Sequence, residues 1–308
     1  MKRPEVTVIV PIYNGAAYLA ETLNSLCSQT FQNFELLAID DGSTDASSDI
    51  VQAFKDKRIR LIKRPNGGLC ETLNLGIAEA NAPFIARCDQ DDISFPGRLE
   101  RQLQVMRAYP EALSLFTYST KFGSRHGWSN ADKTVMAPGE LKEYKPMKDG
   151  CLLGSTMFAR TDALRSIGGF RQAYYPSDDW DLECRLAQAG KVLILCEPLI
   201  AYRFQPGANT YRFFALMREK TRWVKNSYQR SLRALPELTF EEFKLAQPGD
   251  PWSRWGRWYR DSSKLHMRTA GQRYLDGYYM AGVSHLFAAI LFDPADILRR
   301  MRRYVTHR

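Results

Sequence analysis

The 308-residue chain lacks the long apolar runs that several protein classes require. No run approaches the 18 or more residues of a membrane span, and the apolar run at 283–292 has only ten. The opening residues, 1–5, lead directly into a strand-like pattern, so we expect no secretory signal. We therefore predict a cytoplasmic protein that is either free or peripheral on the inner face of a membrane.

Cysteine pairs and nucleotide-loop motifs are also missing. The six cysteines form no CxxC pair and have no histidines at zinc spacing, so we interpret them as reduced, mostly buried thiols. No GxGxxG motif follows the first predicted strand, and no GxxxxGK(S/T) motif occurs. Both absences argue against a dehydrogenase and a P-loop enzyme. The sequence shows no internal repeat.

Positive charge is concentrated at the end of the chain. The net charge is +9, yet residues 211–308 hold 19 Lys and Arg against 9 Asp and Glu, a balance of +10. This segment has a helical pattern and places three tryptophans among arginines at 252–260. Such a composition favours packed helices with solvated basic faces or attachment to an anionic membrane, and it argues only weakly for nucleic acid.

Strand and helix patterns alternate through the first 110 residues. Apolar, β-branched runs predict strands at 6–11, 34–39, 59–62 and 83–86. Helical spacing follows each of them, at 17–26, 50–54, 69–80 and 96–109. This order predicts an α/β protein with a mostly parallel, doubly wound sheet and flanking helices.

Polar residues follow three of these strands. They are Tyr13-Asn14 after the first, Asp40-Asp41 after the second and Asp89-Gln90-Asp91-Asp92 after the fourth. Ligands of such sheets bind at the carboxyl ends of the strands, so we predict that the three groups form one site.

The second part of the chain is less regular. Residues 121–150 have the composition of a loop with little core. A helix is predicted to open at Ser177 and to carry Asp179 on the same face as Leu182 and Leu186. A carboxylate in the first turn of a helix gains from the helix dipole, whether or not it has a function.

With these pieces in place, the sequence resembles a family 2 inverting glycosyltransferase of the GT-A fold. The segments that carry the resemblance lie in the family's order between about residues 5 and 205. They are VTVIVPIYNG, SQTFQNFELLAIDDGSTD, NGGL, LNLGI, IARCDQDDISFPGRL, GGF and SDDWDL. The resemblance implies a catalytic domain at 1–210, with a nucleotide-binding half at about 1–120 and an acceptor half at about 121–210. Residues 211–308 form a basic helical extension that matches nothing in the family.

A metal site is implied by the acidic motif. By resemblance, Asp91 is the principal metal ligand, Asp89 faces ribose or metal, and Asp92 orients its neighbours. Mg²⁺ and Mn²⁺ both suit carboxylate oxygens, and either would stabilise the departing diphosphate of a nucleotide sugar.

The donor site is implied by four further residues. Asp41 would accept a hydrogen bond from the nucleotide base, while Pro11 and Tyr13 would line its pocket. Alternatively, Pro11 simply ends a strand. Arg87 would meet the diphosphate, although a structural salt bridge is an equal interpretation.

The general base is expected in the acidic pair before the later helix. Asp179 matches the family's aspartate, and Asp178 stands where glutamate is usual. Asp179 would take the proton of an acceptor hydroxyl as that oxygen attacks the anomeric carbon. Because the two aspartates are adjacent, Asp178 remains the alternative.

The sequence departs from the family at position 205. Where the family often carries a metal-binding histidine, this chain has Gln205, a weaker ligand. We therefore expect a metal held by Asp91, diphosphate and water, with Gln205 as a possible substitute.

The implied reaction moves a sugar from a nucleotide donor, in our interpretation a uridine one, to a hydroxyl of a glycan or lipid-linked glycan. The rival interpretations are another nucleotide-binding enzyme, such as a sugar nucleotidyltransferase, and a basic membrane-binding protein without catalysis. A nucleotidyltransferase would need a glycine-rich loop with Arg or Lys after the first strand, and residues 12–15 are not that.

Overall fold

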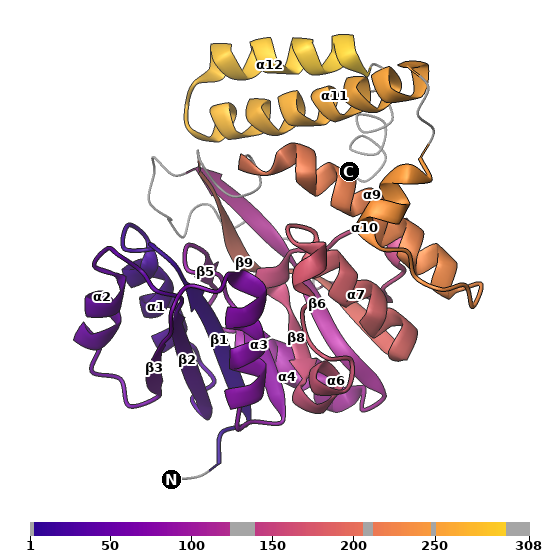
Figure 1. Ribbon diagram of the computed structural model, residues 1–308. Coiled ribbons are helices and arrows are strands. Elements are labelled where there is room, and N and C mark those ends of the chain that lie inside the picture. The colour runs from indigo at the N-terminus through magenta and orange to yellow at the C-terminus, as the bar shows by residue number, and fades with distance from the viewer. Residues whose placement is uncertain (1–2, 124–138, 206–211, 248–250, 294–308) are drawn as a thin grey trace. The chain divides into compact units, whose positions relative to one another are not determined.

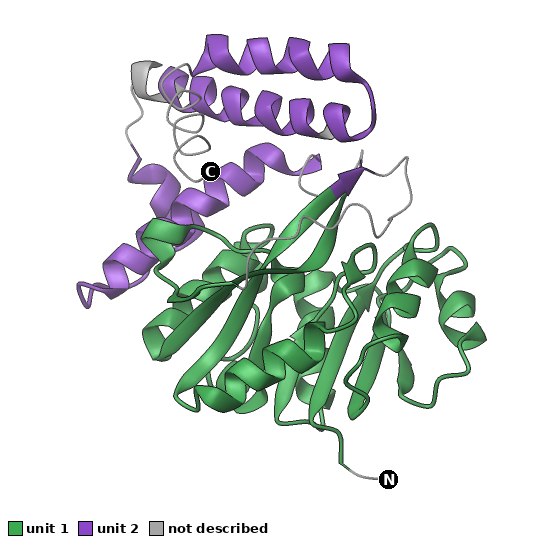
Figure 2. Cartoon of the chain, turned by 180° about the vertical axis from the view of Figure 1, so that it is seen from behind, with its two compact units in different colours: residues 1–121, 128–203 green, residues 122–127, 204–308 purple. Residues whose placement is uncertain are grey.

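The computed structural model describes residues 3–123, 139–205, 212–247 and 251–293. The chain forms two compact units, one of residues 1–121 and 128–203 and one of residues 122–127 and 204–308 (Figure 2).

The first unit is built on a mixed sheet with the strand order β3-β2-β1-β4-β8-β6-β9-β5 (Figure 1). Its parallel part comprises β1 (Val6–Ile12), β2 (Phe34–Asp40), β3 (Ile59–Lys63) and β4 (Phe84–Arg87). The antiparallel part adds β5 (Ile93–Ser94), β6 (Ala112–Gly123), β7 (Leu141–Glu143), β8 (Phe158–Arg160) and β9 (Lys191–Phe204). The α/β class is confirmed, and parallel pairing joins the first four strands.

Helices cover both faces of this sheet. On one face α1 (Leu19–Cys27), α2 (Ser47–Ala53) and α4 (Arg98–Ala108) pack on the even-numbered residues of β1. On the other face, α3 (Leu69–Glu79), α6 (Thr161–Ser166) and α7 (Asp178–Ala189) share a second core with Ile9 and Ile39. Every residue of β1 is therefore buried, as its continuous β-branched run predicts.

The region 121–150 is more ordered than its composition suggests, and the loop prediction is wrong for its second part. Residues 139–150 contain β7 and the short helix α5 (Pro146–Asp149), while residues 124–138 lie outside the described part of the chain. Tyr144 is buried, and its hydroxyl lies 2.8 Å from the Glu183 carboxylate. Pattern analysis missed this because β7 is only three residues long and gains its order from pairing with β9.

The second unit is helical, as the sequence predicts. It contains α9 (Phe214–Ser231), α10 (Phe240–Leu245), α11 (Pro251–Leu275) and α12 (Tyr279–Phe292). A capping box between Thr239 and Glu242 begins α10. A turn ending at Tyr278 reverses the chain, so that α11 and α12 run side by side as a hairpin (Figure 1). The arginines at 299–303 lie outside the described residues, as do the side chains of Trp252 and Arg254. Among the described helices, none is both long enough and apolar enough to cross a membrane.

Candidate active site

The loops after β1 and β4 are joined by one side chain of the acidic motif. The Gln90 amide accepts a hydrogen bond from the Tyr13 N–H at 2.9 Å and donates to the Tyr13 carbonyl at 3.0 Å. Gly15 makes room for this clamp, since a Cβ there would lie 2.3 Å from the Gln90 side chain. The Tyr13 side chain remains 50% exposed at the edge of the sheet, whereas Pro11 is buried inside β1.

The loops after β1 and β2 are also joined. Asn14 donates its N–H to Ser43 at 3.0 Å, and its side-chain oxygen accepts the N–H of Thr44 at 2.8 Å. Asp40 is buried and accepts hydrogen bonds from Ser43 and Ser48. Burial opposes its charge, but these hydrogen bonds outweigh burial and lower the pKa of Asp40. Asp40 is thus the residue that stabilises the turn.

Asp41 holds the loop after β3. Its carboxylate accepts the N–H groups of Gly67 at 3.0 Å and Gly68 at 2.8 Å, and Arg64 lies 3.3 Å away. Gly68 has a φ of 92°, which glycine adopts without strain. The three strand-end groups therefore converge on one edge of the sheet, as the sequence predicts.

Arg87 is the centre of the acidic cluster. Its side chain is buried, and it donates to both oxygens of Asp89, at 2.8 and 3.2 Å. Its remaining terminal nitrogen donates to Asp179 at 2.5 Å. Burial opposes the charge of Arg87, but Asp179 and Asp89 outweigh it and raise the pKa of the guanidinium well above its usual value. One buried cation thus connects the DxD motif to the acidic pair of α7.

The two aspartates of that pair have different environments. Asp178 is buried, while the side chain of Asp179 is 29% exposed. Burial, followed by the charge of Asp179, raises the pKa of Asp178 to about 7. The helical spacing had placed Asp179 on the buried face, and this detail is wrong because the first turn of α7 rotates Asp178 inward instead.

Asp91 and Asp92 occupy the turn that follows Asp89. Asp91 is half-buried, and its carbonyl accepts the Arg203 Nε at 2.9 Å. Asp92 is fully buried and accepts the Arg203 N–H at 3.1 Å. Burial, with the charges of Asp91 and Asp89, raises the pKa of Asp92 well above its usual value. Asp92 thus ties the acidic turn to β9.

The residues that could hold a metal ion suit an ion that takes most of its ligands from the nucleotide donor and from water. Asp91 is partly exposed, and Asp89 is paired with Arg87. Within the described residues, no group of three or more His, Cys, Asp or Glu is arranged to hold an ion. Gln205 directly follows β9.

Residues that the motifs did not single out support this cluster. Arg98 is fully buried and donates to the carbonyls of Arg87 and Ser155, at 2.6 Å each. The Ser155 hydroxyl accepts the Asp89 N–H at 3.0 Å. Gly154 lies against the ion pair, since a Cβ there would be 2.5 Å from Arg87 and 2.8 Å from Asp179. The sequence signal for this role was the pair Arg98 and Gln102, which lie one turn apart on a helix face that otherwise carries Leu99, Leu103 and Met106.

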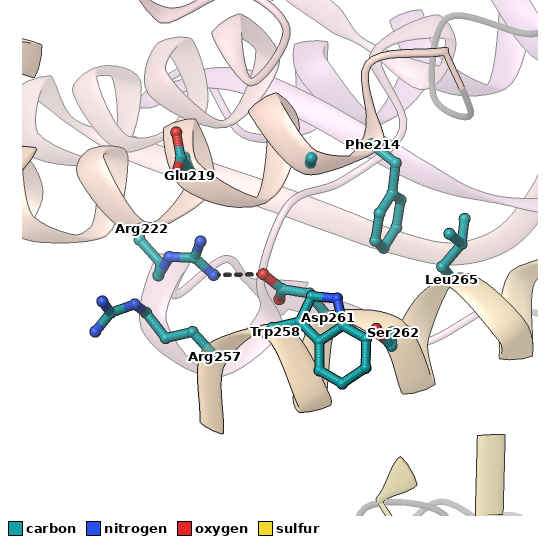
Figure 3. Close-up of a pocket in the computed structure, with 9 residues that line it drawn as sticks. Phe214, Glu219, Arg222, Arg257, Trp258, Asp261, Ser262 and Leu265 are labelled. Carbon is teal, nitrogen blue, oxygen red and sulfur yellow. Dashed lines mark hydrogen bonds and ion pairs between the residues drawn. The ribbon is translucent and has the colours of Figure 1, made fainter. Parts of the chain in front are cut away.

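The second unit has a cavity of its own, of about 360 Å³. Glu219 and Arg222 of α9 line it opposite Arg257, Trp258 and Asp261 of α11 (Figure 3). Arg222 and Asp261 form an ion pair at 2.9 Å, which connects the two helices.

Comparison with known proteins identifies the family. The family described as glycosyl transferase family 2 matches residues 7–168, which is more than half of the chain. The chain belongs to glycosyl transferase family 2. This match ends before α7, so Asp178, Asp179 and Gln205 of this family 2 member lie beyond it.

Related sequences agree with the family. EpsE of Bacillus subtilis is 34% identical over 196 residues, which are 61% of this chain and 68% of EpsE. A glycosyltransferase of Rickettsia felis is 26% identical over 65% of this chain and only 34% of its own length. A match to a glycosyltransferase of Rickettsia prowazekii covers 66% of that protein.

Solved structures agree with the fold. Residues 1–349 of S. aureus TarS, solved with UDP-GlcNAc, have a TM-score of 0.58 at 16% identity, over 92% of this chain and 90% of that 1–349 chain. PcManGT, a mannosyltransferase of Pyrobaculum calidifontis solved with GDP-Man and Mn²⁺, has a TM-score of 0.54 at 16% identity. This match covers 100% of this chain and 82% of the PcManGT chain. The family 2 member therefore has the GT-A fold.

Proposed function

We propose that this protein is an inverting glycosyltransferase that moves a sugar from a nucleoside diphosphate donor, a uridine one, to a hydroxyl of a glycan or lipid-linked glycan. The observation that carries the proposal is the position of Arg87 between Asp89 of the DxD motif and Asp179 of α7. The same guanidinium thus contacts Asp89, a candidate residue of the sugar-nucleotide site, and Asp179, the candidate base.

The donor would bind at the edge formed by the loops after β1, β2 and β4. The exposed Tyr13 ring offers area for stacking on the base. Asp41 Oδ1 accepts the Gly67 N–H and pairs with Arg64, while Oδ2 accepts the Gly68 N–H and has a second lone pair for a donor group of the base. Buried Pro11 would support the floor of the pocket. The TarS and PcManGT structures, which hold UDP-GlcNAc and GDP-Man, support this class of donor.

The diphosphate would be met by Arg87 and by a divalent cation. Asp91 would hold Mg²⁺ or Mn²⁺ together with Asp89, and Gln205 is proposed as a weak further ligand. When bound, such an ion stabilises the charge that develops on the leaving diphosphate. The presence of Mn²⁺ in PcManGT supports this assignment.

Asp179 is the proposed general base. Its carboxylate takes the proton of the acceptor hydroxyl while that oxygen forms a bond to the anomeric carbon. The bond from this carbon to the diphosphate oxygen breaks on the opposite side, so the configuration inverts. Asp179 suits the role better than Asp178 because its side chain is partly exposed.

The donor can be tested by thermal shift with a panel of uridine, guanosine and thymidine diphosphate sugars, with and without Mn²⁺. A uridine diphosphate sugar that raises the melting temperature, and is then hydrolysed or transferred, supports the proposal. Stabilisation by nucleoside triphosphates alone would favour a nucleotidyltransferase instead.

The acceptor is proposed to lie at an anionic membrane, with the basic second unit facing the lipid. The +10 balance of residues 211–308 supports this partner. No role in binding nucleic acid is proposed.

A further inference from the structure

Helix α12 exposes an apolar face that carries no charge. Its 14 residues include no Asp, Glu, Lys or Arg. Met280, Phe287 and Leu291 are 83%, 64% and 76% exposed, and Val283 and Leu286 are also exposed. These positions recur at three- and four-residue spacing, so they form one stripe along the helix. Monomeric proteins rarely leave so continuous an apolar surface in water.

The opposite face of α12 is fixed against α11 by small residues. Gly282 and Ala289 are buried, and a Cβ on Gly282 would lie 3.2 Å from the Ala270 carbonyl. Ser263 of α11 donates its hydroxyl to the Ala289 carbonyl at 2.9 Å. This packing determines the rotation of α12, and it leaves the apolar stripe facing away from α11.

Amphipathic aromatic residues lie at both ends of the hairpin. Tyr274 and Tyr279 are exposed at one end, with ring centroids 5.2 Å apart. At the other end Trp258 is exposed and contacts Phe292 edge-on, with centroids 5.6 Å apart. Tyrosine and tryptophan are the residues enriched at the boundary between lipid headgroups and acyl chains.

We propose that α12 is an interfacial anchor that lies in the plane of an anionic membrane, with its apolar stripe inserted among the acyl chains. A helix of 14 residues is about 21 Å long, too short to span a hydrocarbon core of about 30 Å. This proposal rests on the membrane partner given under the proposed function. It adds which surface of the protein contacts the membrane and how that surface binds.

Charge favours a lipid surface over a second copy of the chain. Arg260 and Arg273 are exposed on α11, and Arg273 lies 5.4 Å from the Tyr278 ring. Basic residues beside an apolar helix can extend to anionic headgroups while the helix lies below them. Two copies meeting through this face would bring their like charges together, since residues 211–308 carry +10.

The test is sedimentation of the full chain with vesicles. One set contains phosphatidylcholine alone and the other adds phosphatidylglycerol. The test variant combines Met280→Ser, Phe287→Ser and Leu291→Gln, whose exposed side chains leave the helix packing intact. The matched control combines Leu232→Gln, Leu235→Gln and Leu245→Gln, three other exposed leucines of the same unit. Circular dichroism and donor-sugar hydrolysis verify that each variant folds.

We expect the parent and the control to bind the anionic vesicles, and the α12 variant to partition into them at least tenfold less. Higher salt should weaken the parent's binding without abolishing it, because the apolar part is not screened. Equal binding by the α12 variant, or no binding by the parent, would overturn the proposal. So would a parent dimer in light scattering that the α12 variant converts to a monomer without vesicle binding. If the chain binds vesicles through α12 but transfers no sugar, the proposed function is wrong while the proposal for α12 still holds.

Discussion

Arg87 donates a 2.5 Å hydrogen bond to Asp179, a residue 92 positions further along the chain. The same guanidinium holds Asp89. If the donor diphosphate binds Arg87 as proposed, we expect it to change the contacts of the candidate base as well. One buried cation thus connects Asp89 of the acidic motif to the candidate base Asp179.

The first prediction separates the two aspartates of α7. Asp179→Asn should lower kcat about 10²–10⁴-fold, because the amide cannot accept the proton, and should leave the KM for the donor nearly unchanged. Asp178→Asn, at the buried neighbour, should keep most of the activity. Steady-state kinetics measure both. Loss of donor binding in Asp179→Asn, or loss of turnover only in Asp178→Asn, would show that the base is misassigned.

The second prediction concerns Arg87. Arg87→Lys should lower kcat and thermal stability together, because an ammonium group cannot donate to Asp89 and Asp179 in the geometry of a guanidinium. Arg60→Lys is the control, since Arg60 forms an exposed ion pair with Glu79 that contributes at most about 1 kcal/mol. Melting curves and kinetics on both variants provide the measurement. A fully active Arg87→Lys enzyme would argue against the link.

The third prediction concerns close packing at Gly154. Gly154→Ala would force a methyl group to within 2.5 Å of Arg87 and 2.8 Å of Asp179, so we expect at least a tenfold loss of kcat. Gly271→Ala, where an added Cβ meets nothing within 4 Å, should instead stabilise α11 by up to about 1 kcal/mol. Denaturant unfolding and activity distinguish the two. An active Gly154→Ala protein would mean that the ion pair tolerates displacement.

The fourth prediction is a pH dependence of stability at Asp178. Burial and the charge of Asp179 raise its pKa to about 7, against 3.8 for the ordinary group. Between these values the folded chain keeps a proton that the unfolded chain releases, so this carboxyl makes stability fall as pH rises. Above about pH 7 the loss is complete. The stability of Asp178→Asn relative to the parent should therefore rise between about pH 4 and 7 and then level off. Urea unfolding across this range tests the sign, and a difference that does not change with pH would contradict it.

The fifth prediction concerns the metal. Removal of divalent ions with EDTA should abolish transfer, and Mn²⁺ or Mg²⁺ should restore it in the parent but not in Asp91→Ala. Because the described carboxylates form no three-ligand group, we expect Mn²⁺ to bind tightly only when a nucleoside diphosphate is present. Calorimetry with Mn²⁺ alone and with UDP measures this dependence. Tight binding without nucleotide would require ligands beyond those named.

Much of the first half of the chain was predictable because its signals are local. The β-branched run of β1, the turn residues after β2 and the acidic motif after β4 each lie in one short stretch. In a parallel sheet the carboxyl ends of such strands meet at one edge, so their convergence followed from pattern alone. β9 was not predicted, because Glu197 and Pro198 interrupt its apolar run and its partners are distant in sequence.

The sequence by itself determined the α/β class, the edge at which polar residues gather and the family. Only the tertiary structure decided which aspartate of α7 is buried, which carboxylates Arg87 joins and which face of α12 is left uncovered. These outcomes depend on the rotation of a helix and on contacts between distant segments. Helical spacing places a residue only to within part of a turn, and one residue at the start of α7 separates a buried carboxyl from an accessible one.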